Sequence, residues 1–402
     1  MTQDNKNIAA DIHFQMKWRS QEAIHTEEYE AYNVNFWRDC LPKEIYNKLG
    51  STSVGQTVQI DFTPGAIVPG YDLRKIFEIK EAQFNRNFTP EKEIQPRMGR
   101  FYPKGLLKGV AGVFSQNLQP FRCVGIENGH LKVDFNHPLA DKRIQLKAFV
   151  KRIRLKSVER GGRCYDWMEI MADGPGMQAR WEGRPTDFLS ENPFQRQDLR
   201  SDMLFYQNQR LVQHIDSRAI EEIKGINGRL LHDGMCVMDL MGSWKSHLPE
   251  DLHLEKLSGL GLNAEELSKN ADLTDWIVHD LNENPTLPYK TGSYDAIICT
   301  LSIEYLIDPD TVFKEIGRVL KHRGLFIVTF SNRWFPEKVI DIWKDLHEFE
   351  RMGLVMEYFQ KSKMFKDLET YSIRGLPRPK EDKYYHEIMD SDPIYAVWGY
   401  RV

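Results

Sequence analysis

Residues 237–249, VMDLMGSWKSHLP, hold the residue types in this sequence that are best suited to binding a ligand. Two apolar residues lead to Asp239, and Gly242 follows three positions later. A glycine just after a strand lets the chain turn tightly and brings backbone N–H groups close to a ligand. The further glycines that a pyrophosphate-binding loop needs are missing. Because an acid suits a positively charged ligand, the spacing predicts a site for a nucleoside cation without phosphates.

Other polar residues stand where strands are expected to end. They lie in GLGLNAEEL, in IVHDLNENPTLPY and in SYDAIICTLSIEYLIDPDTVFKEIGRVLKHRGLFIVTFSNR: Asn263, Asp280, Ser302, Glu304, Tyr305, Asn332 and Arg333. Ligands of open parallel sheets bind beyond the carboxyl ends of the strands, at the point where the strand order reverses. We therefore expect several of these side chains to share one crevice with Asp239.

The elements that must position them form an α/β pattern from about residue 203 onward. A helical stretch, FYQNQRLVQHIDSRAIEEI, leads into the strand CVMDLM. DAIICTLS is a continuous apolar run, typical of a strand buried on both faces. Asp308 is expected to cap the next helix, with Pro309 in its first turn and Gly324 at its end. LFIVTF then predicts the next parallel strand.

The first half of the chain predicts mainly β structure. VQIDF, RCVGIENGHLKVDF and IQLKAFV have strand character, and Asn128-Gly129 is a strong hairpin signal. We expect four regions: a helical extension over residues 1–50, a β domain over 51–156, an irregular connector over 157–200, and an α/β domain over 201–402.

The order and spacing of the C-terminal motifs resemble class I S-adenosylmethionine-dependent methyltransferases, of the type 11-like kind. VMDLMGSW is similar to their first motif, and RVLKHRG to their turn after the fourth strand. The resemblance implies a Rossmann-like domain that binds S-adenosylmethionine. One departure is Gly261, which stands where the family usually has a ribose-binding acid; Asn263 is a candidate replacement.

The resemblance also implies roles for individual residues. The expected cofactor-binding residues are Tyr206, Arg210, Asp239, Met241, Gly242, Asn263, Asp280, Leu281 and Ser302. The expected catalytic residues are His247, Glu304 and Tyr305, and the expected substrate contacts are Trp244, Asn332 and Arg333, with Arg374 and Arg378 as further anion-binding candidates.

Each of these roles has a structural alternative. Asp239 could cap a helix, and Asp280 could be an ordinary loop residue. Trp244 and His247, on an expected helix after the loop, could be packing residues, and Tyr206 with Arg210 could belong to a surface helix face.

Residues 100–153 resemble FKBP-type prolyl isomerases that carry an insert in the flap. The most telling segment is VDFNHPLADKRIQL, and VGQTVQIDFTPGAIVPGYD places Tyr71 near the family's aromatic pocket. The resemblance implies a smaller, mainly β FKBP-like domain that contacts peptides or is purely structural.

Composition restricts the remaining function classes. The net charge is −4, so nothing attracts the whole chain to nucleic acid or to acidic membranes, and the basic run at residues 142–156 is expected to be a half-solvated strand. The five cysteines are scattered without metal-ligand spacing, which favours a cytoplasmic protein with no metal site.

The sequence is compatible with two main functions, and a nucleotide-binding oxidoreductase is a less favoured third. The first is a methyltransferase that acts on a small-molecule acceptor, such as a thiol or another heteroatom nucleophile. The alternative is a peptidyl-prolyl isomerase or chaperone-type peptide-binding protein with a vestigial methyltransferase domain.

Overall fold

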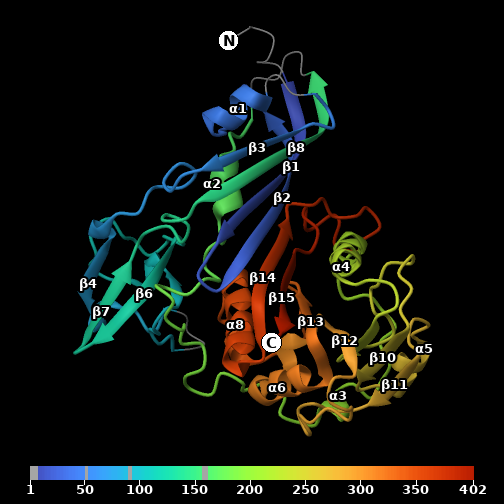
Figure 1. The fold of residues 1–402 in the computed structure, drawn as a ribbon. Helices are drawn as coiled ribbons and strands as arrows, with labels where there is room; N and C mark the ends of the chain where they lie inside the picture. Colours follow the sequence, from blue (N-terminus) through green and yellow to red (C-terminus); the bar gives the residue numbers. More distant parts are fainter. Residues whose placement is uncertain (1–7, 50–52, 89–92, 156–161) are drawn as a thin grey trace.

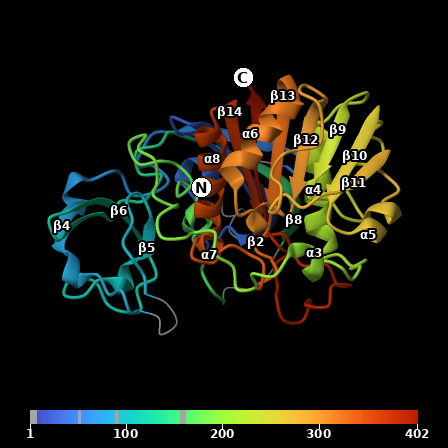
Figure 2. The ribbon, with the colours of Figure 1, turned by 90° about the horizontal axis from the view of Figure 1, so that it is seen from below.

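One long sheet organises the molecule (Figure 1). The computed structural model describes residues 8–49, 53–88, 93–155 and 162–402. The sheet has eleven strands in the order β11-β10-β9-β12-β13-β15-β14-β2-β1-β8-β3. A separate four-stranded sheet, β4-β7-β6-β5, lies to one side of it (Figure 2). The boundaries expected near residues 50 and 156 lie outside the described residues.

Seven strands of the long sheet come from the C-terminal half of the chain. They are β9 (Cys236–Leu240), β10 (Lys256–Gly261), β11 (Asp275–Val278), β12 (Tyr294–Thr300), β13 (Leu320–Phe330), β14 (Phe365–Arg374) and β15 (Ile394–Arg401). From β9 the chain moves outward to β10 and β11, and then returns to place β12 and β13 on the other side of β9. The strand order therefore reverses between β9 and β12, and a ligand crevice is expected there.

Helices cover both faces of these strands. Side chains alternate between the faces along β12, so Ile297 and Cys299 pack in the core under α6 (Pro309–Val319) and α8 (Glu348–Ser362). Their neighbours Ala296 and Ile298 pack on the opposite side with α4 (Ser217–Leu230). β12 is therefore buried on both faces, as its continuous apolar run predicts. The shorter helices are α2 (Trp167–Ala172), α3 (Asp202–Phe205), α5 (Ala264–Lys269) and α7 (Asp341–Lys344), with 3-10 turns η2 (Leu73–Lys75), η3 (Glu81–Gln83), η4 (Lys104–Leu106) and η5 (Ile303–Tyr305).

The helix α6 begins as expected but ends earlier. The Asp308 side chain accepts a hydrogen bond from the Thr311 amide at 3.1 Å, and Pro309 is the first helical residue. The helix ends at Val319, and Gly324 lies within β13. The Ser293 amide donates to the Val319 carbonyl at 2.7 Å, so the end of the helix is fixed by the loop before β12.

Two other helices that the sequence predicts are not found as expected: the first is interrupted and the second is absent. The stretch from Phe205 to Ile223 is interrupted, because residues 206–216 form an irregular segment between α3 and α4. Asp216 accepts from the amides of Arg218 and Ala219 and starts α4 there. Residues 241–255, where we expected Trp244 and His247 on a helix, contain no helix at all. His247 has a left-handed φ of 51° and Pro249 follows two positions later, which suits an extended strap.

The expected N-terminal helical extension is also wrong. Residues 8–35 form the long hairpin of β1 (Ile8–Arg19) and β2 (Ala23–Asn35), and only α1 (Lys43–Leu49) is helical. The apolar residues of β1 recur at every second position, and Ile12, Phe14 and Met16 are all buried. That period of two is the strand pattern, and it outweighs helix propensity here.

The small sheet is an insert between two paired strands. β3 (Thr57–Phe62) and β8 (Ile144–Leu155) pair with each other in the long sheet, and the chain between them forms β4 (Ile76–Lys80), β5 (Phe101–Pro103), β6 (Pro120–Glu127) and β7 (His130–Asp134). The predicted hairpin is confirmed: Glu127 pairs with His130, and Asn128 and Gly129 both have positive φ.

The two halves of the chain share buried contacts. β2 pairs in parallel with β14, which makes the sheet continuous. Glu27 on β2 is buried and accepts hydrogen bonds from the connector residue Gln178 at 2.7 Å and from Ser372 on β14. Arg100, beside the small sheet, forms a buried ion pair with Glu350 on α8, with Nε 3.0 Å from Oε1. The N-terminal half is therefore anchored to the C-terminal sheet. Among the described residues no helix is both long and apolar enough to cross a bilayer.

Candidate active site

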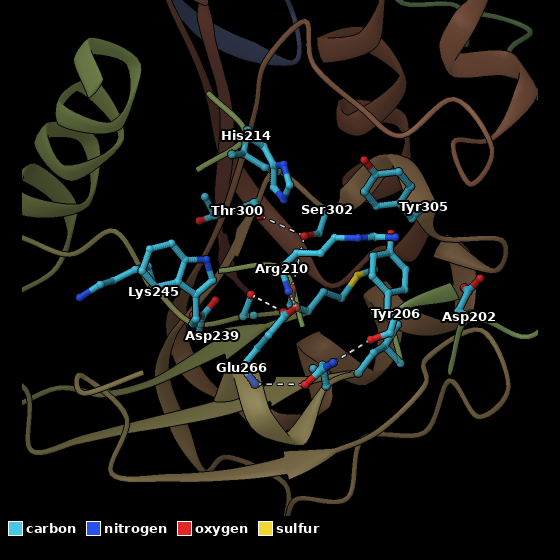
Figure 3. A pocket seen from close by; sticks show the side chains of 18 of the residues that line it. Asp202, Tyr206, Arg210, His214, Asp239, Lys245, Glu266, Thr300, Ser302 and Tyr305 are labelled. Atoms are coloured by element: carbon cyan, nitrogen blue, oxygen red, sulfur yellow. Dashed lines mark hydrogen bonds between the residues drawn. The ribbon is translucent and has the colours of Figure 1, made fainter. Parts of the chain in front are cut away.

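A cavity opens at the strand-order reversal between β9 and β12 (Figure 3). It encloses about 1150 Å³, including the part open to solvent. Twelve of the predicted site residues line it: Tyr206, Arg210, Asp239, Met241, Gly242, Trp244, His247, Asn263, Asp280, Leu281, Ser302 and Tyr305. The fold thus brings together side chains that lie up to 99 positions apart in the sequence, from Tyr206 to Tyr305.

Asp239 is the last but one residue of β9, just before the loop. Its side chain is buried, and Oδ2 accepts a hydrogen bond from Ser246 Oγ at 2.7 Å. Burial raises the pKa of the Asp239 carboxyl to about 7. A Cβ at Gly242 would lie 2.7 Å from the Asp239 carboxylate, so glycine is required at this turn. A cationic ligand group would favour the ionised form of this carboxyl.

The missing acid at position 261 has a steric cause. A Cβ on Gly261 would lie 2.2 Å from the Gly242 carbonyl oxygen. The Gly242 amide donates to the Leu260 carbonyl at 2.8 Å, which holds the loop against the end of β10. No side chain fits at Gly261 unless this loop moves.

Asn263 does not provide the replacement that we expected. Its Oδ1 caps α5 by accepting from the amides of Glu265 and Glu266, at 2.9 and 3.1 Å. Its Nδ2 donates to the carbonyls of Tyr206 and Gln207, at 2.8 and 3.2 Å. An amide side chain has two donor and two acceptor positions, so all four are used. The Asn263 side chain therefore links the start of α5 to the main chain of residues 206 and 207 at the cavity edge.

The irregular residues 206–216, here called the lid segment, carry Arg210 over the cavity. The Arg210 guanidinium lies 4.5 Å from the ring centre of Phe205, 5.4 Å from that of Tyr206 and 4.8 Å from that of Phe335. Nη2 donates to the Phe205 carbonyl at 3.3 Å, whereas Nη1 is buried without a hydrogen-bond partner among the described residues. A buried, unpaired guanidinium N–H is suited to an anionic ligand group.

Two more residues that line the cavity each carry a buried polar atom without a partner among the described residues. Asp280 Oδ1 accepts from the Asn282 amide at 2.9 Å, but Oδ2 has no hydrogen bond. Thr300 Oγ1, at the end of β12, is in the same state. Unsatisfied buried polar groups are rare and costly, so several of them around one cavity point to a polar ligand.

Two of the imidazole groups that line this cavity, His214 and His247, have lowered pKa values. Burial, with smaller contributions from Lys224 and Lys245, lowers the pKa of His247 to about 4. His214, on the lid segment, packs edge-on against Phe335 with ring centres 5.0 Å apart, and burial together with Arg210 lowers its pKa. Burial raises the pKa of the Tyr305 phenol, whose oxygen accepts from the Phe335 amide at 2.9 Å. Both imidazoles are therefore neutral at pH 7 and are weaker bases than an ordinary histidine, while Tyr305 stays protonated.

Three predicted residues do not line the cavity. Glu304 is fully buried behind it, and burial raises the pKa of its carboxyl to about 8. Asn332 is exposed, and Arg333 Nε donates to Asp392 at 2.9 Å. The structure therefore contradicts the catalytic role expected for Glu304 and the substrate contacts expected for Asn332 and Arg333.

The two further anion-binding candidates, Arg374 and Arg378, also form hydrogen bonds away from the cavity. Arg378 donates to Asp392 and Asp382, and Arg374 donates to the carbonyls of Asp173 and Met171. These arginines stabilise the loop after β14 and its contact with the connector.

Sequence reasoning missed other residues that line the cavity: His214, Glu266, Thr300 and Phe335. Glu266 had a usable signal, because it follows the helix-capping Asn263 by three positions. His214 was missed because its segment was expected to be a helix, and Phe335 because nothing in its local sequence marks it.

Comparison with known proteins agrees with this site. Residues 255–328, from just before β10 into β13, match the family model described as methyltransferase domain. No curated protein matches the chain. Among solved structures, an S-adenosylmethionine-dependent methyltransferase from Thermotoga maritima is 15% identical with a TM-score of 0.34, and covers 46% of this chain and 90% of its own.

Two further structures give similar values. A methyltransferase from Mesorhizobium loti is 14% identical over 44% of this chain and 96% of its own, with a TM-score of 0.31. Geranyl diphosphate C-methyltransferase from Streptomyces coelicolor is 13% identical over 51% and 95%, also with 0.31. These scores are too low to assign a substrate. The family match spans β10 to β12, which form one side of the cavity, so residues 255–328 carry the match to a methyltransferase domain.

Proposed function

We propose that this protein transfers the methyl group of S-adenosylmethionine to a small-molecule acceptor with a heteroatom nucleophile, such as a thiol. The observation that carries the proposal is the set of three buried polar atoms without partners, on Arg210, Asp280 and Thr300, around a single cavity at the strand-order reversal. They lie on three separate elements, and a ligand that spans the strand ends would satisfy all of them.

The polar groups match the parts of the cofactor. Arg210 Nη1 would hold its carboxylate, and the Asp239 carboxyl would hold its ammonium group. Asp280 would hold the adenine edge, beside Leu281. When bound, the cofactor supplies an electrophilic methyl group on a sulfonium centre.

The chain's own residues would then align the acceptor and exclude water. Methyl transfer is an in-line displacement, in which positioning contributes most of the rate. Tyr206, Tyr305 and Phe335 supply an aromatic wall beside Ser302, and this wall suits an acceptor with an apolar part. For an acceptor that carries a proton, the neutral imidazole of His214 or His247 would accept it. A thiolate would need positioning alone.

We further propose that the N-terminal half is an FKBP-like accessory module, without nucleic-acid or membrane partners and in the cytoplasm. The small sheet supports this, because it is inserted between the paired strands β3 and β8, as an insert in a flap would be. Asn136, in the segment that returns from the insert, donates to the Asp72 carbonyl and accepts from its amide. Tyr71 beside it is exposed on a loop, so the proposal assigns this module peptide contact and no isomerase reaction.

Calorimetry tests the cofactor site. The wild-type protein should bind S-adenosylhomocysteine with micromolar affinity. Arg210→Ala should weaken this affinity by about tenfold to a hundredfold, the range expected for losing a charged hydrogen bond. 5′-Methylthioadenosine lacks the amino-acid part, so its affinity should stay unchanged. Arg218→Ala, at an exposed position on α4, is the matched control.

A second assay tests the reaction. Methyl-labelled cofactor is incubated with the protein and with a panel of thiols, amines and phenols. Transfer to at least one small molecule supports the proposal. If the wild-type protein does not bind S-adenosylhomocysteine, the proposed function is refuted.

A further inference from the structure

We infer that Glu266 is the residue that binds the ribose hydroxyls of the cofactor. This inference rests on the proposed function and adds a residue to its site. It starts from the position that an acid would ordinarily occupy, which is Gly261 in this chain. The Gly242 carbonyl closes that position, since a Cβ there would approach it to 2.2 Å.

Glu266 lies on α5, just after the end of β10, and its carboxylate points into the cavity (Figure 3). The residue is 9% exposed. Oε1 accepts a hydrogen bond from the Arg210 amide at 2.6 Å, and Oε2 accepts one from Ser243 Oγ at 2.6 Å. The carboxylate therefore stands between the lid segment and the loop after β9, the two segments that would enclose a nucleoside.

The remaining hydrogen-bonding capacity of Glu266 fits a diol. An ionised carboxylate accepts about four hydrogen bonds, and the protein uses two of them here. Each oxygen thus keeps one free acceptor position. Two adjacent ribose hydroxyls are donors that can use both positions at once, and bonds to a charged acceptor are the stronger kind.

The neighbouring polar side chain cannot take this role. Asn263 lies at the same edge of the cavity, but its two donors and two acceptors all bind main-chain groups. Of these two side chains, Glu266 is thus the one with acceptor capacity left for a ribose.

The arrangement also links ribose binding to the lid segment. The Glu266 carboxylate holds the Arg210 amide, and Arg210 is the residue proposed to hold the cofactor carboxylate. A ribose bound to Glu266 would stiffen this carboxylate and, through it, the main chain that carries Arg210. Glu266 would then position both ends of the cofactor.

A ligand-by-variant cycle tests the inference. The affinities of S-adenosylhomocysteine and of its 2′-deoxy and 3′-deoxy analogues are measured by calorimetry for the wild-type protein and for Glu266→Gln. In the wild type, removing a hydroxyl should weaken binding by about tenfold, as expected for one bond to a charged group. In Glu266→Gln the parent ligand should bind about tenfold to a hundredfold more weakly, and the deoxy analogues should bind nearly as well as the parent.

Controls separate ribose binding from a structural role. Glu265→Gln removes the same charge at an exposed position on the same helix, and it should keep the full penalty for the deoxy analogues. Glu266→Asp keeps the charge but withdraws the carboxylate, and it should lose the penalty as Gln does. If Glu266→Gln fails to fold, the Asp variant completes the cycle.

The inference is overturned if Glu266 variants weaken the parent and the deoxy analogues by the same factor, because the residue would then act only on the lid. It is also overturned if the wild type does not distinguish these ligands. In both cases S-adenosylhomocysteine still binds the wild type and the proposed function stands. If the wild type binds none of the three ligands, the proposed function is lost as well.

Discussion

Replacing Asp239 with Asn should stabilise the folded protein at neutral pH while it removes cofactor binding. Burial raises the pKa of this carboxyl from 3.8 to about 7. Between these values the unfolded chain loses the proton and the folded protein keeps it. The free energy of unfolding of the wild type therefore falls as the pH rises, by about 1.4 kcal/mol per pH unit from this group. Well above pH 7 both states are ionised, and this group no longer changes the free energy of unfolding with pH.

Asn keeps an oxygen that can accept the Ser246 hydrogen bond, and it carries no charge at any pH. The gain in the free energy of unfolding for Asp239→Asn over the wild type should grow by about 2 kcal/mol between pH 5 and pH 7, and should level off above that pKa. Urea unfolding at several pH values measures it. Asp251→Asn makes the same charge change at an exposed position and should show no comparable growth.

Cofactor affinity has the opposite pH dependence. The cofactor's ammonium group needs the ionised carboxylate, so S-adenosylhomocysteine should bind the wild type up to tenfold more tightly per pH unit from pH 5 to pH 7. Asp239→Asn should bind it weakly and without this slope. A pH-independent stability gain, or an Asn variant with the affinity and slope of the wild type, would refute the reasoning.

Two further predictions concern the fold around the site. Gly261→Ala places a Cβ against the Gly242 carbonyl, so calorimetry should show S-adenosylhomocysteine affinity reduced by about tenfold or more, whereas Gly225→Ala in the open middle of α4 should leave it unchanged. Arg100→Met leaves the buried carboxylate of Glu350 without its cationic partner. Chemical denaturation should then show a free energy of unfolding lower by about 3–5 kcal/mol. Lys344→Met breaks a partly exposed pair and should cost less than about 1 kcal/mol; equal costs would contradict the role given to the buried pair.

The sequence by itself determined the α/β character of the C-terminal half and the main parts of the cavity. The buried run of β12, the Asp308 cap and the Asp239–Gly242 turn are local patterns, and local patterns express backbone preferences and hydrophobic periodicity directly. The hairpin at Asn128-Gly129 is of the same kind. Because strand ends of a parallel sheet meet at one edge, the convergence of Asp239, Asp280 and Ser302 followed from their positions after these strands.

Tertiary structure decided the rest. The sequence does not show that β2 pairs with β14, since strand pairing between distant segments depends on edge geometry and on buried polar contacts such as Glu27 with Ser372. It also does not show that Glu304 is buried outside the cavity lining, or that all hydrogen-bonding positions of the Asn263 side chain are used by main-chain groups. These outcomes depend on which groups the folded chain brings within hydrogen-bonding distance, and a residue's type gives only its capacity to form such bonds.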